Sequence, residues 1–232
     1  MSPQHPPIQR DSSPPSSPAP PDSPESTTMP DFEFTVENIV ATAILPIAQK
    51  IDLTSIAARF PDVEYNPERF PGLIMRNPSP KATILLFSTG KMVITGLREE
   101  SEAAPVVGEI LQRLAECNIR VGPPAITIQN VVASGDVKCS VDLNLAAVAM
   151  DHSMYEPEVF PGLIYRMQEP KAVFLVFSTG KVVCTGAKSK AMVATAVERL
   201  YYLLRECGVA GDRSRFLGTE DEDEEEEEMI FI

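Results

Sequence analysis

The chain has 232 residues with a formal net charge of −13, and 44% of its residues are hydrophobic. Nine acidic residues stand together at 220–228, so the middle of the chain is close to neutral. A near-neutral middle excludes nucleic-acid binding through a broad basic surface. Any such binding would use an apolar contact face with a few well-placed cations. Two histidines and four cysteines without a CxxC motif argue against a zinc site, and no run of about eighteen apolar residues predicts a membrane span.

The first segment of the chain is rich in proline and serine. Residues 1–30 hold ten prolines and seven serines with hardly any large apolar residue. Such a composition cannot bury enough surface to offset the entropy of ordering, so we expect a disordered leader. The segment also lacks the basic and apolar regions of a signal peptide, and we therefore expect an intracellular protein.

A tandem duplication follows the leader. Residues 70–96 reappear as residues 160–186, with 18 of 27 positions identical. The spacing predicts two copies of one folding unit, a first repeat over 31–120 and a second over 121–212, with an acidic tail over 213–232. Two such copies are related by a pseudo-twofold axis and present a quasi-symmetric surface to a quasi-symmetric partner.

The elements of the two copies agree. In the first copy, hydrophobic alternation, an N-cap signal and turn residues predict, in order, a strand over 32–43, a short helix over 52–59, a strand from 63, an extended segment over 73–76, a hairpin over 83–95 and a long helix over 99–117. In the second copy the same signals predict a strand over 125–134, a short helix over 144–150, a hairpin over 173–185 and a long helix over 191–207. This order gives an α+β protein with antiparallel strands and helices on one side.

The hairpin strands are apolar on both faces, whereas the helices can cover only one. Alternation places Ile84, Leu86, Met92 and Ile94 on one face. It places on the other face Leu85, Phe87, Lys91, Val93 and Thr95, with Leu175, Phe177, Lys181, Val183 and Thr185 in the second copy. A free apolar face rimmed by lysine predicts a large partner surface that is itself partly apolar. The alternative, a core with helices on both sides, needs more helices than the chain supplies.

Each copy begins with a strand that carries one asparagine between apolar residues. These are Asn38 and Asn130. An asparagine amide can donate to adenine N3 and thymine O2, the acceptors that A·T and T·A pairs share in the minor groove. The alternative is a structural cross-strand hydrogen bond, and these residues alone do not decide between the two.

Aromatic and cationic residues recur at matching positions. The phenylalanines are Phe70, Phe87, Phe160 and Phe177, which either pack in the core or act as wedges between base steps. The cations are Arg76, Lys91, Arg98, Arg166, Lys181 and Lys188, which either bind phosphates around the apolar face or are ordinary solvated charges.

This motif set resembles the TATA-box-binding protein family over about residues 31–210. The resemblance implies a saddle-shaped, ten-stranded antiparallel sheet with four helices on its convex face, lying on a widened minor groove; the family is itself the standard example of such kinking. It assigns the central asparagines to Asn38 and Asn130 and the intercalating pairs to Phe70 with Phe87 and Phe160 with Phe177. It also assigns the groove-lining residues Val40, Val93, Thr95, Val132, Val183 and Thr185.

The resemblance further implies protein partners and a source. The turn before Phe160 resembles the family's second stirrup, where Glu156, Glu158 and Val159 would contact initiation factor B, and RNA polymerase would be recruited indirectly; the alternative is a solvated loop. The identical Phe-Pro-Gly-Leu in both copies, the balanced core and the acidic tail favour an archaeal type, located in the cytoplasm or nucleoid. No cofactor and no catalysis are implied, and the exposed apolar face predicts a homodimer without DNA.

Two other classes of function remain as alternatives. An enzyme or small-ligand binder is disfavoured, because the chain has no Gly-rich phosphate loop and its predicted ordered part has one histidine, His152. A protein-interaction scaffold would use the apolar face for another protein. The tail at 220–228 is interpreted as a solvated run, with shielding of the apolar face from nonspecific DNA as the alternative.

Overall fold

The structure, a computed structural model, describes residues 33–212. The predicted leader and acidic tail lie outside these residues. The elements of the first repeat are β1 (Phe34–Ile44), α1 (Leu53–Arg59), β2 (Val63–Glu64), β3 (Gly72–Pro78), β4 (Lys81–Phe87), β5 (Lys91–Leu97), a short 3-10 turn η1 (Glu100–Glu102) and α2 (Ala103–Glu116). Those of the second are β6 (Ile126–Asp136), β7 (Ser140–Val141), α3 (Leu143–Ala149), β8 (Ser153–Met154), β9 (Leu163–Met167), β10 (Ala172–Val176), β11 (Lys181–Ala187), α4 (Lys190–Glu206) and β12 (Ala210–Gly211).

The main sheet has ten antiparallel strands in the order β2-β3-β4-β5-β1-β6-β11-β10-β9-β8. This order is symmetric about the β1–β6 pair, where Asn38 lies opposite Val132 and Val40 opposite Asn130. The two repeats therefore form one continuous sheet, and the predicted α+β class with ten antiparallel strands and four helices is confirmed. The sequence patterns missed a second sheet, in which β12 pairs with β7.

The short helices begin where the sequence supplies a capping side chain. Asp52 accepts hydrogen bonds from the backbone N–H groups of Thr54 and Ser55, at 3.0 and 3.3 Å. Asp142 accepts one from Leu145 N at 3.0 Å, and the Ser189 hydroxyl accepts one from Met192 N at 3.1 Å at the start of α4. Such caps satisfy N–H groups that the first helical turn leaves unpaired. Hydrogen bonds from the Ser55 side chain and backbone also lower the pKa of Asp52.

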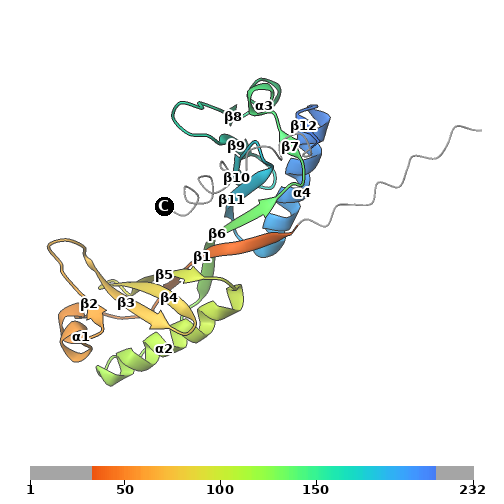
Figure 1. The fold of residues 1–232 in the computed structure, drawn as a ribbon. Coiled ribbons are helices and arrows are strands. Elements are labelled where there is room, and N and C mark those ends of the chain that lie inside the picture. Colours follow the sequence, from red (N-terminus) through yellow and green to blue (C-terminus); the bar gives the residue numbers. More distant parts are fainter. Residues whose placement is uncertain (1–32, 213–232) are drawn as a thin grey trace, which may run out of the picture. The chain divides into compact units, whose positions relative to one another are not determined.

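One face of the sheet forms the hydrophobic core. Ile84, Leu86, Met92 and Ile94 are fully buried, as the alternation predicted, and in the second repeat Phe174, Val176, Val182 and Cys184 are buried at the matching positions. The helices bring Val106, Ile110 and Leu114 from α2 and Val193, Val197 and Leu200 from α4 to the same core. Figure 1 shows α2 along the first-repeat strands and α4 along the second-repeat strands. Burial of one such aliphatic side chain contributes about 1.5–3 kcal/mol, so this face holds the helices and leaves the other open.

The four cysteines form no disulfide. Cys117 and Cys207 are half-buried, whereas Cys184 is buried. Across residues 33–212, no helix has the length and apolar character needed to cross a bilayer.

Candidate nucleic-acid interface

The sheet face opposite the helices is called the open face below. It is formed by side chains from the six central strands, and its cross-strand pairs repeat in the two halves of the sheet. In the first half, Leu85 lies opposite Val93 and Thr83 opposite Thr95. In the second half, Leu175 lies opposite Val183 and Val173 opposite Thr185. At the centre, β1 and β6 contribute Asn38, Val40, Asn130 and Val132. The structure therefore brings the predicted groove-lining residues together on one surface.

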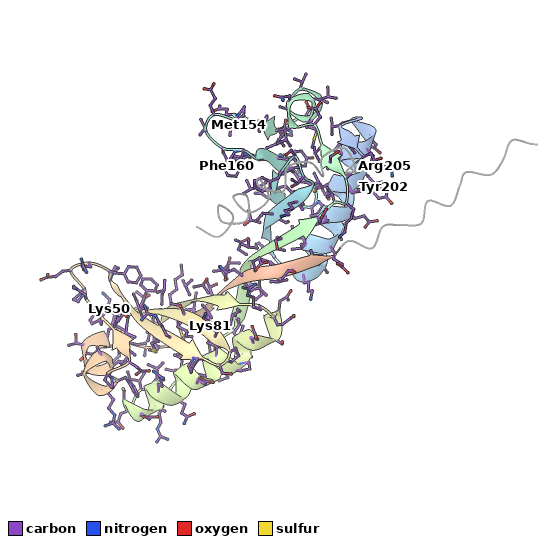
Figure 2. The ribbon with its side chains drawn as sticks, viewed as in Figure 1. Lys50, Lys81, Met154, Phe160, Tyr202 and Arg205 are labelled. Carbon is purple, nitrogen blue, oxygen red and sulfur yellow. The ribbon has the colours of Figure 1, made fainter. Side chains whose placement is uncertain are left out.

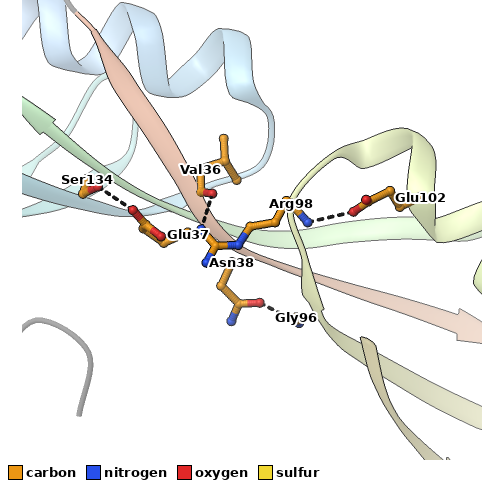
Figure 3. A network of polar contacts seen from close by, with 7 residues as sticks. All are labelled: Val36, Glu37, Asn38, Gly96, Arg98, Glu102 and Ser134. Carbon is orange, nitrogen blue, oxygen red and sulfur yellow. Dashed lines mark hydrogen bonds and ion pairs between the residues drawn. The ribbon is translucent and has the colours of Figure 1, made fainter. Parts of the chain in front are cut away.

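Asn38 is held by the bulged end of β5. Its Oδ1 accepts a hydrogen bond from Gly96 N at 2.7 Å, which Figure 3 shows, and a second one from the Thr95 hydroxyl at 3.2 Å. A backbone N–H can only donate, so this contact assigns the amide oxygen to the inner position. Within the described residues no partner contacts Asn38 Nδ2, and the amide donor is left for an external acceptor.

Asn130 repeats this arrangement in the second half. Its Oδ1 accepts from Gly186 N at 2.7 Å and from the Thr185 hydroxyl at 3.3 Å, and its Nδ2 lies 3.1 Å from the same hydroxyl. An Nδ2 group carries two hydrogens, so one hydrogen-bond partner leaves the second available. Both asparagines thus form the cross-strand contacts that the sequence left open, and these contacts orient the amide donors.

The four predicted wedge residues form two pairs. The ring centroids of Phe70 and Phe87 are 5.7 Å apart with an interplanar angle of 64°, and those of Phe160 and Phe177 are 5.9 Å apart at 63°. Both are edge-to-face arrangements, which aromatic pairs favour. In Figure 2, Phe160 lies on the side of the second-repeat strands away from Tyr202 and Arg205 of α4. The two pairs stand at the two ends of the open face.

In the second repeat, Phe177, Val183 and Lys181 stand at the positions of Phe87, Val93 and Lys91.

The six predicted cations differ in their surroundings. Arg76 forms an ion pair with Glu64, and Arg98 forms one with Glu37 and also donates to Val36 O at 2.9 Å. The side chains of Lys91, Arg166 and Lys188 are exposed. Surface ion pairs of the Arg76 kind contribute only about 0–1 kcal/mol to stability.

A pair of polar residues at the centre was missed by the sequence patterns. A bulge in each central strand turns Glu37 and Gln129 towards the open face. Glu37 accepts a hydrogen bond from the Ser134 hydroxyl at 2.7 Å, and Gln129 Nε2 donates one to the Thr42 hydroxyl at 2.8 Å (Figure 3 shows the first). The two contacts are related by the pseudo-twofold, but only one carries a charge. Strict alternation hid these residues, because a bulge shifts it by one position.

The predicted partner-binding residues form a tight exposed turn. Val159 N and Phe160 N both donate to Glu156 O, at 2.9 and 3.0 Å, and Glu156 and Glu158 are exposed. Val159 is 79% exposed. Large apolar side chains are also exposed nearby along the chain, namely Leu145 and Val148 on α3 and Met154 on β8 (Figure 2 labels Met154). The first repeat has Ser55, Ala58 and Glu64 at these positions.

The fold and this face define a class of protein: a duplicated α+β binding protein whose sheet keeps one mostly apolar face open and carries an oriented amide in each half. No group of metal-ligating side chains was found among residues 33–212.

The comparisons agree on one family. The model of a family described as "Transcription factor TFIID (or TATA-binding protein, TBP)" matches residues 33–117 and 125–207. A TATA-box-binding protein from Pyrobaculum calidifontis is 49% identical over 177 residues, covering 76% of this chain and 88% of that relative. One from Aeropyrum pernix is 48% identical over 179 residues, covering 77% of this chain and 87% of that relative. The solved structure titled "Methanococcus jannaschii TBP" superposes with a TM-score of 0.69 at 37% identity and covers 75% of this chain and 99% of that one.

The chain belongs to the TATA-box-binding protein family. The resemblance predicted from its motifs is thereby confirmed. This is a family of DNA-binding transcription factors and not of enzymes, which sets aside the enzyme alternative.

Proposed function

We propose that the chain is a general transcription initiation factor that binds A·T-rich promoter DNA in the minor groove through the open face and bends it. The observation that carries the proposal is the oriented pair of asparagines. Their oxygens are occupied by the N–H groups of Gly96 and Gly186, so the groups left to face outward are donors. Adenine N3 and thymine O2 are acceptors in equivalent places for both A·T orientations, whereas a G·C pair adds a donor at guanine N2.

The surroundings of the asparagines support contact with a groove floor. Val40, Val93, Val132, Val183, Leu85 and Leu175, with Thr95 and Thr185, give the centre of the face an apolar surface without the broad positive charge of a major-groove binder. Base edges and sugars of a widened minor groove are partly apolar, and burial of such surface contributes about 25 cal/mol per Å². The phenylalanine pairs at the two ends are placed to enter between base steps and kink the duplex.

The cations at the rim supply sequence-independent contacts. We assign this role to Arg76, Lys91, Arg98, Arg166, Lys181 and Lys188. Their recurrence in the two repeats matches the two strands of a duplex that runs across the pseudo-twofold. Arg98 would keep its contact with Val36 O while its pairing to Glu37 is exchanged for a phosphate.

A gel-shift and bending assay tests the proposal. Full-length chain is mixed with a duplex that carries an A·T-rich element and with a control in which that element is G·C, at several salt concentrations, and the end-to-end distance of the bound duplex is followed by energy transfer. We expect a bent complex on the A·T element and much weaker binding to the control. Equal weak binding to both duplexes would overturn the proposal and make the open face a protein-binding surface.

We further propose that the turn at Glu156, Glu158 and Val159 binds initiation factor B, which then brings RNA polymerase. Exposed carboxylates around a 79% exposed valine suit a partner surface with basic rims and an apolar centre. Glu156→Arg should leave DNA binding unchanged and abolish the ternary complex with factor B, whereas Glu109→Arg on α2 should leave both intact. Loss of DNA binding in the Glu156 variant would refute a partner-contact role.

The open face also gives a reason for self-association. Monomeric proteins rarely expose an apolar patch as large as a whole sheet face to water. We therefore propose a dimer at high protein concentration that dissociates when promoter DNA is added. An intracellular location follows from the promoter as partner. Light scattering that finds only monomer at every concentration would contradict the dimer.

A further inference from the structure

We propose that a groove beside α1 in the first repeat binds an extended, acidic segment of a partner protein, which adds to the groove as a β-strand. This α1 groove is lined by residues 46–52, Ser55 and 117–121, which belong to the loop after β1, to α1 and to the segment that follows α2. None of them contributes to the open face, so the proposal does not depend on what the open face binds.

The second repeat shows the same place in a closed form. There β12 pairs with β7, with Gly211 opposite Ser140. Next to this pair, Asp142 N donates to Val209 O at 3.0 Å. The chain that leaves α4 therefore adds a strand along the start of α3 in its own repeat.

The first repeat leaves this place open. Residues 119–121 and 50–52 stand at the matching positions, and within residues 33–212 the structure has no strand pairing between them. Instead, the two segments line a cavity of about 570 Å³. No backbone carbonyl of the described chain accepts a hydrogen bond from Asp52 N, the counterpart of Asp142 N, or from the N–H groups of residues 48–50. This edge of the groove therefore offers donors to an added strand.

Residue size explains in part why the first repeat does not close. A Cβ built on Gly211 would meet Ser140 Oγ at 2.8 Å, so the close pairing of β12 with β7 depends on small residues at this point. The first repeat has Val121 and Lys50 at these two positions. Their larger side chains keep the segments apart.

The charge of Arg120 acts in the same direction. In the register of the second repeat, Arg120 would lie opposite Ile51, as Ala210 lies opposite Val141. Ile51 is buried, so its partner in such a pair would be turned to the apolar side. Burial of a charge without a partner is costly, and Arg120 is instead exposed. The segment after α2 therefore leaves the groove to another strand.

The lining of the α1 groove selects the chemistry of that strand. Its floor is apolar and is formed by the buried or half-buried side chains of Ile47, Ile51, Ile119 and Val121. Lys50 and Arg120 add two exposed cations (Figure 2 labels Lys50). The carboxylate of Asp52 is occupied as the cap of α1. A strand that alternates apolar residues with carboxylates suits this lining, because its successive side chains point to opposite sides.

A short peptide tests the proposal without DNA. The probe alternates glutamate with valine, is blocked at both ends and carries a fluorescent label. We expect saturable binding to the full-length chain with a dissociation constant below about 1 mM, and at least about tenfold weaker binding when lysine replaces glutamate. No saturable binding of the acidic peptide, or equal binding of both peptides, would overturn the proposal.

Charge reversal separates binding in the groove from general attraction. The double variant Lys50→Glu, Arg120→Glu should bind the acidic peptide at least about tenfold more weakly, because two favourable contacts become repulsive. The matched control is Lys171→Glu with Arg199→Glu, two exposed positions of the second repeat. It changes the net charge equally and should bind the peptide normally. Equal weakening in both double variants would refute binding in the α1 groove.

Amide exchange on the unsubstituted chain reports strand addition itself. In the free chain, the N–H of Asp52 should exchange rapidly, whereas that of Asp142 is hydrogen-bonded and serves as the internal control. Saturating acidic peptide should protect Asp52 and at least one amide among residues 48–50, and leave Asp142 unchanged. Nuclear magnetic resonance measures these rates residue by residue. Peptide binding without this protection would contradict strand addition.

Other occupants of the groove give distinct results in the same experiment. Protection of the Asp52 amide in the free chain at low concentration would mean that another part of the same chain fills the groove. Protection that rises with protein concentration in the absence of peptide would make a second copy of the chain the occupant. Either result would overturn the assignment of the groove to a partner protein.

Discussion

At the scale of single residues, each asparagine amide has a structural role, and we propose that the same side chain also contacts DNA. The sequence left two interpretations of Asn38 and Asn130, a base contact or a cross-strand hydrogen bond. The structure shows the cross-strand hydrogen bonds, at 2.7 Å to Gly96 N and Gly186 N. These bonds use the oxygens and leave at least one N–H of each amide, so the base contact is kept as a proposal with a defined donor.

Asn130→Asp separates the two roles. The carboxylate still accepts from Gly186 N, so the fold should persist, but it cannot donate and it brings negative charge to the groove floor. We expect a loss of A·T-element affinity of about ten- to a hundredfold, the cost of about 1–3 kcal/mol for a lost base contact. Asn144→Asp on α3 makes the same charge change away from the face and should bind normally. Titration with a labelled duplex measures the affinity, and a thermal melt checks that the fold persists. Full affinity in the Asn130 variant would refute the donor role.

Cys184 gives a prediction about pH. Burial raises the pKa of its thiol to about 12 from an ordinary 9.0. The buried thiol therefore stays protonated at pH 8, and iodoacetamide should modify Cys117 and Cys207 long before Cys184. The unfolded thiol ionises from about pH 9 while the folded one does not, so the free energy of unfolding should fall as the pH rises towards 12. Mass spectrometry of the alkylated chain checks the order in which the thiols are modified. Early modification of Cys184 would mean that its strand opens.

At the scale of elements, the hairpin turns show that equivalent positions in the repeats need not be equally constrained. Gly90 and Gly180 both have positive φ, 80° and 88°. A Cβ on Gly90 would meet the Ile47 side chain at 2.9 Å, whereas one on Gly180 would meet the backbone oxygen of Cys139 at 2.0 Å. A side-chain terminus can move aside, but a backbone held by neighbouring hydrogen bonds cannot.

Gly180→Ala should therefore destabilise the chain much more than Gly90→Ala. We expect about 1 kcal/mol for Gly90→Ala, from the left-handed backbone alone, and about 3 kcal/mol or more for Gly180→Ala. Denaturant unfolding of the two variants measures both values. Equal losses would show that the loop containing Cys139 yields, contrary to the packing described here.

The elements also show what a sequence can predict. Alternation placed Ile84 and Leu86 in the core and Leu85 on the open face, because a regular strand has a strict period of two. It missed β7 and β12, since two-residue strands about seventy residues apart carry no periodic signal. It missed Glu37 and Gln129 because bulges interrupt the period.

At the scale of the whole molecule, the sheet is nearly symmetric, and some departures from symmetry fall on the surfaces for which we propose functions. Glu37 carries a charge where Gln129 carries none, and α3 exposes Val148 where α1 has Ala58. An A·T-rich minor groove is itself nearly symmetric, so a binding orientation must come from such differences or from partners. The proposed contacts with factor B lie on the second repeat.

The most direct test of minor-groove recognition uses inosine. An I·C pair lacks the guanine N2 amino group, so it presents the minor-groove acceptors of an A·T pair while its major groove matches that of a G·C pair. Full-length chain is titrated with three duplexes that differ only in the recognised element, A·T, I·C or G·C, and binding and bending are measured together. We predict that the I·C duplex is bound and bent nearly as well as the A·T duplex, while the G·C duplex is not. Binding of I·C as weak as that of G·C would contradict readout through the minor groove by the open face.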